Sequence, residues 1–213
     1  MESRALNDAD KERKYEKILS TTLKLFKRER RLHTAAEICK EVKIAKGTLY
    51  LYFSTKEEIY MELLVRNFRR WHESVREHLL DRAPDAAGFI LYLCRSLADF
   101  TDFVDLTALA SVVLEENLPP EYVRVARQKN RQETRRTCQL IARSFPEWSE
   151  DFCELSLRRF YTYGIAYWKE CFPSGPVVAA LPAEYLDIEA QRSKFFNEIL
   201  LMNHLIWGLQ NKP

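Results

Sequence analysis

The chain has 213 residues and a formal net charge of +2 at pH 7, and it is 46% hydrophobic and 30% charged, which excludes disordered and fibrous classes. It has no apolar run long enough to cross a membrane and no N-terminal signal-peptide pattern, so we expect a cytoplasmic protein without membrane contact. Five cysteines without a C-x-x-C pair indicate reduced thiols rather than disulfides, and we expect neither a metal nor a cofactor.

The first informative elements lie between residues 34 and 53, where two short apolar patterns flank a tight turn. Ile38 and Val42 are four residues apart, as are Leu49 and Phe53, which places each pair on one face of a helix. Two small helices can therefore share one core. The front of the second helix carries small or polar side chains and then two phenolic hydroxyls: Ala45, Lys46, Gly47, Thr48, Tyr50 and Tyr52. Such a helix front is typical of helix-turn-helix docking on DNA.

The run AKGTLYLYFSTKE at residues 45–57 resembles the DNA-binding segment of the TetR family of transcriptional regulators, which commonly has K-G-T-L-Y, any residue, Y-F, two residues and K-E. The resemblance covers residues 11–71. It implies a DNA-binding domain there, with its helix-turn-helix at 34–53 and a double-stranded operator as partner. The DNA-contacting positions that it implies are Thr34, Ala45, Lys46, Gly47, Thr48, Tyr50, Tyr52 and Lys56.

Several of these positions also have an ordinary structural explanation. Gly47 weakens a helix by about 0.5–1 kcal/mol relative to alanine, so close approach to DNA or tight packing of the two helices would explain it. Thr48 could cap locally, Tyr52 could be a half-buried packing residue, and Lys56 could simply be solvated. Lys46 is a cation at a helix N-terminus, which a nearby phosphate or base edge explains better than solvation does.

Two positions depart from the family pattern. Lys43 stands where the turn usually has glycine, and a lysine with positive φ costs on the order of 1 kcal/mol unless the turn changes its geometry. Ala45 stands at the N-cap of the recognition helix, where serine or threonine would contribute roughly 1 kcal/mol. The tip of this helix is therefore expected to be looser than in typical members.

A long helix is predicted from about residue 56 to 80. Thr55 and Glu58 have the spacing of a capping box at its start. Its apolar residues recur at multiples of four and are Ile59, Leu63, Trp71, Val75 and Leu79. In the TetR family the equivalent helix joins the DNA-binding domain to the ligand-binding body, which makes it the mechanical link between them.

Charge divides the chain in the same way. Residues 24–56 contain nine lysines and arginines against three glutamates, a local net charge of +6 on a chain of only +2. A basic N-terminal part on a slightly acidic body is what binding to backbone phosphates requires. An ordinary charged helical surface remains the alternative for Lys24, Lys27 and Arg28.

The remainder, residues 72–213, is predicted to be a helical effector-binding and dimerisation domain. Only five glycines and long patterns of period 3.6 predict an all-α fold with about nine helices in total. A helix follows Pro84, a short one carries Leu106 and Leu109, and a longer one opens at Pro120 and runs toward Phe145. The polar middle of that last helix, residues 127–136, is predicted to be solvated on most sides.

The last two helices are apolar on more faces than one domain of this size would be expected to bury. The resemblance implies that they pair with those of a second copy as a four-helix bundle. The residues we assign to this homodimer interface are Phe160, Gly164, Trp168, Phe195, Ile199, Met202 and Ile206. A twofold dimer would place two recognition helices one DNA turn apart and predicts a near-palindromic operator.

By analogy with the family, an effector cavity is expected beneath the long helix, lined by Trp71, Phe100, Phe103, Tyr163 and Tyr167. Such a lining favours a small apolar or aromatic effector that releases a repressor from DNA. The alternative is a helical interaction protein whose helix-turn-helix does not bind DNA. The four histidines form no metalloprotease spacing, and no G-x-S-x-G or phosphate-loop run occurs, so an enzyme is not expected.

Overall fold

The computed structural model describes residues 2–109, 113–173 and 187–208, with side chains from residue 8 onward. Within these ranges the fold is all-α, as predicted, with nine α-helices, one short 3₁₀ helix and no strand. In chain order the elements are α1 (Glu2–Glu29), α2 (Ala35–Val42), α3 (Lys46–Tyr50), α4 (Lys56–Arg82), α5 (Ala86–Asp99), α6 (Thr101–Leu109), η2 (Glu115–Asn117), α7 (Pro120–Ser144), α8 (Glu150–Cys171) and α10 (Ile188–Gly208).

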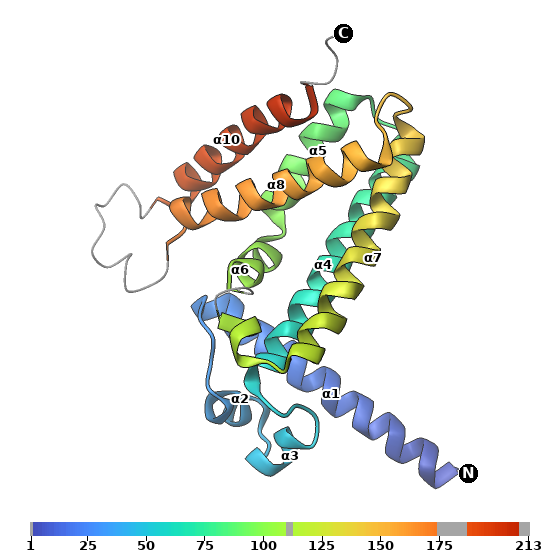
Figure 1. Cartoon of the computed structure of the whole chain (residues 1–213). Coiled ribbons are helices and arrows are strands. Elements are labelled where there is room, and N and C mark those ends of the chain that lie inside the picture. Colours follow the sequence, from blue (N-terminus) through green and yellow to red (C-terminus); the bar gives the residue numbers. More distant parts are fainter. Residues whose placement is uncertain (1, 110–112, 174–186, 209–213) are drawn as a thin grey trace.

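Helices α1, α2 and α3 form a small bundle at one end of the molecule, and the N-terminal part of α1 projects away from it (Figure 1). The predicted shared core of the two short helices is confirmed, because Ile38, Val42, Leu49 and Phe53 are all buried. Tyr15 of α1 stacks on Phe53, with ring centroids 4.9 Å apart. The recognition helix is thus held from below by its own apolar face and by α1.

The long predicted helix is present as α4, which continues through the expected domain boundary at residues 71–72 without a break. The hydroxyl of Thr55 accepts a hydrogen bond from the backbone N–H of Glu58. The carboxylate of Glu58 accepts from the N–H of Ser54 rather than from that of Thr55, so the cap is one residue wider than the predicted box. All five residues of the predicted apolar stripe are buried.

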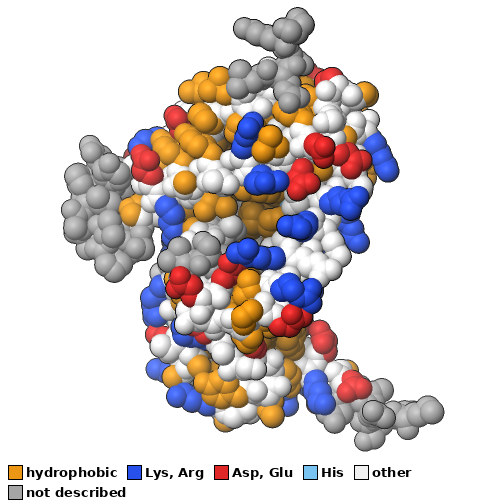
Figure 2. All heavy atoms as spheres, in the orientation of Figure 1, with side chains coloured by type: hydrophobic (Ala, Val, Ile, Leu, Met, Phe, Trp, Pro, Cys, Tyr) orange, Lys and Arg blue, Asp and Glu red, His pale blue; other side chains and the backbone are white. Residues whose placement is uncertain are grey.

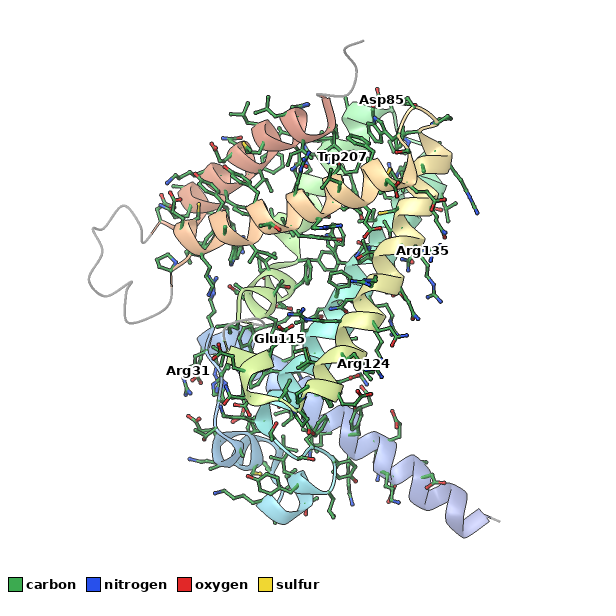
Figure 3. The ribbon with its side chains drawn as sticks, viewed as in Figure 1. Arg31, Asp85, Glu115, Arg124, Arg135 and Trp207 are labelled. Atoms are coloured by element: carbon green, nitrogen blue, oxygen red, sulfur yellow. The ribbon has the colours of Figure 1, made fainter. Side chains whose placement is uncertain are left out.

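Helix α7 lies alongside α4 over much of its length (Figure 1). Most of its polar middle, residues 127–136, is exposed, as predicted, and the side that faces α4 is buried. Ala126 and Thr137 are buried, and the carboxylate of Glu133 lies 3.0 Å from Arg76 of α4. The opposite face carries a row of exposed arginines, namely Arg124, Arg127, Arg131 and Arg135. Arg124 and Arg135 are labelled in Figure 3.

The body is built around aromatic packing. Trp71 of α4 contacts Phe103 of α6 and Phe160 of α8 at centroid distances of 5.9 and 6.2 Å. A second aromatic cluster lies at the far end of the body, where the ring centroids of Trp148 and Trp207 are 4.9 Å apart. Trp207 of α10 is labelled in Figure 3. None of the helices in the described ranges is both long and apolar enough to span a bilayer.

The predicted dimer interface needs correction. Phe160, Trp168, Phe195 and Ile199 are buried inside the single chain, where they pack α8 and α10 against the rest of the body. Gly164 is buried too. A Cβ at this position would lie 2.5 Å from the side chain of Leu97 of α5, so glycine allows this close approach inside the chain. The excess of apolar surface that suggested a partner is largely covered by α5, α6 and α7 and by the packing of α8 on α10.

Of the predicted interface residues, Met202 and Ile206 keep partial exposure. The exposed large apolar residues of these helices lie elsewhere, at Leu155, Ile188, Leu201 and Leu205. Periodicity identified the helices correctly, but it could not say which of their two apolar faces turns inward.

An ion pair joins the DNA-binding domain to the body. Arg30, at the end of α1, has positive φ (49°) and donates a hydrogen bond of 2.7 Å to Asp105 of α6. The same carboxylate oxygen of Asp105 accepts a 2.8 Å hydrogen bond from the indole N–H of Trp168. The guanidinium of Arg30 also lies over the rings of Trp168 and Phe172. Because Asp105 is only 7% exposed, its charge depends on these partners.

We expect Arg30→Met to lower the free energy of unfolding by about 2 kcal/mol, since it leaves a buried carboxylate without its cation, while partial exposure of Arg30 reduces the effect. Arg28→Met, at an exposed ion pair in the same turn, should leave it almost unchanged, because solvent screens such a pair. Urea denaturation of both variants measures the difference. Equal losses would show that Asp105 does not depend on Arg30.

Candidate nucleic-acid interface

The turn between α2 and α3 has the geometry that a helix-turn-helix requires. Lys43 adopts the left-handed conformation (φ 64°, ψ 52°) that glycine usually supplies, so the lysine does not redirect the turn. Its backbone N–H and that of Ile44 donate to the carbonyl of Cys39, which closes the end of α2. Ala45 is the N-cap of α3 and makes no side-chain cap, as predicted.

The front of α3 is open to solvent. Ala45, Lys46 and Gly47 are exposed, and Tyr50 is 52% exposed. Thr48 and Tyr52 are half-buried, and Tyr52 packs against the core. These six predicted contact residues therefore lie on α3 or within two residues of its ends, and four of them are exposed to a partner.

Leu51 is a surface residue that sequence reasoning passed over. It is 82% exposed, more than either neighbouring tyrosine, and it immediately follows α3. In the family pattern this position accepts any residue, so the motif contained no signal for it. An exposed leucine at the tip of a recognition helix can contact deoxyribose or a thymine methyl group.

Gly47 has no neighbour within 4 Å of the position that a Cβ would occupy, and its φ is not positive. Tight packing of the two helices therefore does not require glycine here. The space in front of Gly47 is open, which is the remaining explanation for a residue that weakens its own helix.

The other two predicted contacts are engaged within the chain. The hydroxyl of Thr34 accepts from the N–H of Glu37 and donates to its carboxylate, in a capping box that starts α2. Lys56 lies 2.7 Å from Glu57. The pKa of Glu37 is lowered to about 2, first by its hydrogen bond to Arg31 and then by Thr34.

The local excess of positive charge is smaller than the sequence indicated. Arg28, Arg30 and Arg31 pair with carboxylates, and Lys27 pairs with Asp102 of α6. The lysines of this region that form no ion pair with any described residue are Lys24, Lys40, Lys43 and Lys46. Three of these four flank or form the turn and the recognition helix, where phosphates would lie.

The five residues expected to line an effector cavity are not brought together. Trp71 and Phe103 are fully buried in the packed aromatic core. Tyr163 and Tyr167 stack on one another on α8, and the hydroxyl of Tyr163 donates to Glu198 of α10. Phe100 lies under the guanidinium of Arg70. Aromatic content alone could not separate a filled core from a cavity lining.

One buried polar group stands out in this core. Both ring nitrogens of His72 are hydrogen-bonded. Nδ1 lies 2.8 Å from the hydroxyl of Thr137, and Nε2 lies 2.8 Å from the hydroxyl of Tyr161. Burial lowers the pKa of His72 to about 3, helped by nearby Arg76, so the ring is neutral near pH 7. Within the described ranges no group of three potential ligands is placed to hold a metal ion, and all five cysteines are buried free thiols.

The fold and the exposed helix tip define a helix-turn-helix regulator with a helical body. Sequence comparison agrees: residues 18–63 match the family of bacterial regulatory proteins called tetR, and residues 65–198 match the tetracyclin repressor-like C-terminal domain. The chain belongs to the TetR family of transcriptional regulators, whose members are typically ligand-responsive DNA-binding repressors. No protein among those with curated descriptions matches it.

Two solved structures share this fold. The fatty acid degradation regulator FadR from Bacillus halodurans superposes with a TM-score of 0.57 at 16% identity, covering 88% of this chain and 94% of that one. A protein assigned to the TetR family from Mesorhizobium loti gives a TM-score of 0.54 at 15% identity, covering 90% of this chain and 97% of that one. At these identities the likeness extends to the fold alone.

Gly47→Ala separates stability from DNA contact. In free protein the added methyl meets nothing, and we expect the unfolding free energy to rise by about 0.5–1 kcal/mol. Operator affinity should fall by about tenfold, because the added methyl would keep the backbone of α3 from approaching DNA closely, and loss of one base-pair contact typically costs about 1–3 kcal/mol. Gly208→Ala, at another open helical glycine, is the matched control. Urea denaturation measures the unfolding free energies of the two variants, and fluorescence anisotropy with a selected operator measures their affinities. An unchanged operator affinity of Gly47→Ala would show that Gly47 is not part of the interface.

Proposed function

We propose that this protein is a homodimeric repressor that binds a near-palindromic operator and is released by a small-molecule effector. The observation that carries the proposal is the open front of α3, where Lys46, Gly47 and Tyr50 are presented on a helix whose other face is buried. Thr34, Ala45, Thr48, Tyr52 and Lys56 remain proposed contacts of the surrounding backbone. Lys46 is the residue best suited to read a guanine or hold a phosphate.

The connection between the domains supports ligand response. α4 runs unbroken from beside the recognition helix into the aromatic core, and Arg30 attaches the end of α1 to α6 and α8. A tilt of α4 in the body must therefore move the DNA-binding domain. Coupling free energies of about 1–3 kcal/mol are typical of such switches and suffice to weaken operator binding substantially.

The dimer that we propose uses the outer faces of α8 and α10, and of the residues first assigned to the interface it keeps only Met202 and Ile206. Leu155, Leu201 and Leu205 are exposed there, and Met202 and Ile206 lie half-buried beside them. Figure 2 shows hydrophobic side chains at the surface over these two helices. Exposed leucines clustered on adjacent helices are unfavourable in water and favour association.

The test of DNA binding begins with selection of an operator from random duplex DNA. We expect affinity to fall steeply as salt rises, and Lys46→Ala, which removes one lysine from each copy in the dimer, to reduce the magnitude of the slope of log affinity against log salt by about 1.8. Lys169→Ala, on α8, should leave the slope unchanged. A chain that selects no duplex at low salt would instead support a helical interaction protein.

Leu201→Asp together with Leu205→Asp should convert the dimer to a monomer, because two charges would be buried at the proposed interface. Sedimentation equilibrium at micromolar concentration measures the change, and circular dichroism checks that the helices persist. Leu80→Asp introduces a charge at a similarly exposed leucine of α4 and should remain dimeric. A double variant that stays dimeric would place the interface elsewhere.

A further inference from the structure

A groove opens where the DNA-binding domain meets the body, between α1, α4 and α7. It consists of two hollows of about 440 and 420 Å³ that share Glu62, Val65 and Lys129 as lining residues and are therefore continuous. Each is within the size range of small-molecule sites. We call this feature the interdomain groove. None of the five residues expected to line an effector cavity belongs to it.

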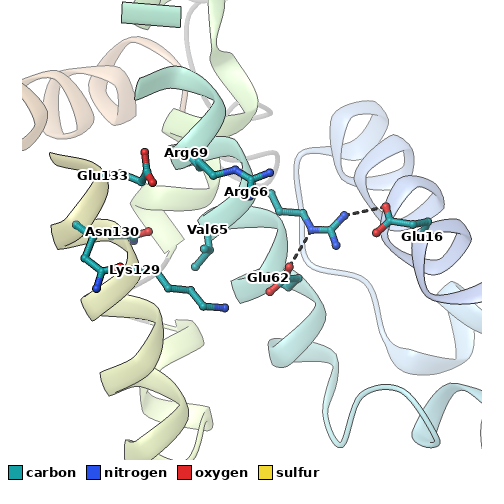
Figure 4. A pocket seen from close by; sticks show the side chains of 9 residues that line it. Glu16, Glu62, Val65, Arg66, Arg69, Lys129, Asn130 and Glu133 are labelled. Atoms are coloured by element: carbon teal, nitrogen blue, oxygen red, sulfur yellow. Dashed lines mark hydrogen bonds and ion pairs between the residues drawn. The ribbon is translucent and has the colours of Figure 1, made fainter. Parts of the chain in front are cut away.

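The two ends of the interdomain groove differ in chemistry. One end is apolar, with Val65 and Tyr122 facing Val125, which is 39% exposed. The other end holds the cations Arg66 and Arg69 together with Lys129, which extends from α7 toward α4 (Figure 4). A ligand that fits both ends has an apolar chain and a charged head.

Whether the head group of such a ligand is an anion or a cation depends on the charges along the groove. Each carboxylate there already forms an ion pair with an arginine. Arg66 pairs with both Glu16 and Glu62, at 2.8 Å each (Figure 4). Glu133 is held by Arg76 and Arg136, and Glu121 by Arg124, and these three arginines do not line the charged end.

Lys129 forms no ion pair with any described residue, and Arg69 lies 3.5 Å from its one carboxylate partner, Glu73. The charged end therefore has as many cations as carboxylates in its lining, and Lys129 is a cation there whose charge no carboxylate of the described residues offsets by an ion pair. The Oδ1 of Asn130 is buried there without a hydrogen-bond partner, and rotation of that amide would offer its NH₂ group to an anion. Both features favour a carboxylate.

We propose that the interdomain groove binds an amphipathic carboxylate, whose apolar chain lies on Val65, Tyr122 and Val125 and whose anion is held by Lys129 and Arg69. This inference rests on the proposed function in one respect, namely that such a ligand is the effector that releases DNA.

The contacts of Arg66 explain how an anion here would reach the recognition helix. Its guanidinium ties α4 to Glu16 of α1 and lies over the ring of Tyr15, which in turn stacks on Phe53 just after α3. A carboxylate in the groove competes with Glu16 for Arg66. Loss of that bond frees α1 and removes support from beneath the DNA-contacting helix, which lowers operator affinity.

The binding test titrates octanoate into the full-length protein by calorimetry, with 1-octanol and octylamine as probes that lack the anion. Octanoate should bind at least about tenfold more tightly than either, because only it makes charge-assisted hydrogen bonds. Hexanoate should bind about tenfold more weakly than octanoate if two methylenes leave the apolar end. Equal affinity for octanoate and octylamine would overturn the proposal.

Two variants locate the site. Lys129→Met should weaken octanoate about tenfold, and Val125→Glu should abolish its binding by placing a like charge at the apolar end. Lys40→Met, at an exposed lysine of α2, is the matched control and should not change octanoate affinity. If both groove variants bind octanoate as wild type does, the ligand lies elsewhere and the proposal fails.

Regulation is measured separately, as operator affinity with and without saturating octanoate. We expect a decrease of at least about fivefold, and Glu16→Gln should lower affinity without ligand and shrink the response to it. Octanoate bound in the groove with unchanged operator affinity would refute its role as effector. Operator binding without any octanoate binding would refute the groove while leaving the proposed repressor intact.

Discussion

The structure depends on a single buried carboxylate. Asp105 lies in the middle of α6, where this helix meets the end of α1 and the side of α8, and Arg30 and Trp168 satisfy its charge. A buried anion is costly unless its partners stay in place, so this contact fixes how the DNA-binding domain sits on the body more firmly than apolar packing alone would. The left-handed backbone of Arg30 is the local strain that aims its side chain at Asp105.

By contrast, the DNA-contacting tip is weakly held. Lys43 occupies a conformation that costs a lysine about 1 kcal/mol, and Ala45 leaves α3 without a side-chain cap. The five residues of α3 keep their place through Leu49 and the stack of Phe53 on Tyr15. The contact between Arg30 and Asp105 holds the two domains together firmly, whereas α3 is held loosely. This combination suits a protein whose DNA affinity must change when the body moves.

The spacing of apolar residues along short stretches of the sequence predicted most of the fold. The spacing of Ile38, Val42, Leu49 and Phe53 predicted the shared core, and the pattern of α4 predicted its length and its buried stripe. The predicted cavity and dimer interface depended instead on which of several apolar faces turns inward. Phe160 and Ile199 have the periodicity of an interface residue and of a core residue alike, and the three-dimensional packing decided for the core.

The sequence by itself determined the helices, the turn chemistry and the family, because these follow from short-range spacing and from capping residues a few positions apart. Only the tertiary structure decided that Gly47 faces open space, that most arginines near the helix-turn-helix are already paired, and that Arg66 connects α1 to α4. The partners in these contacts lie as many as 75 residues apart, as Arg30 and Asp105 do, and no local pattern encodes such distances.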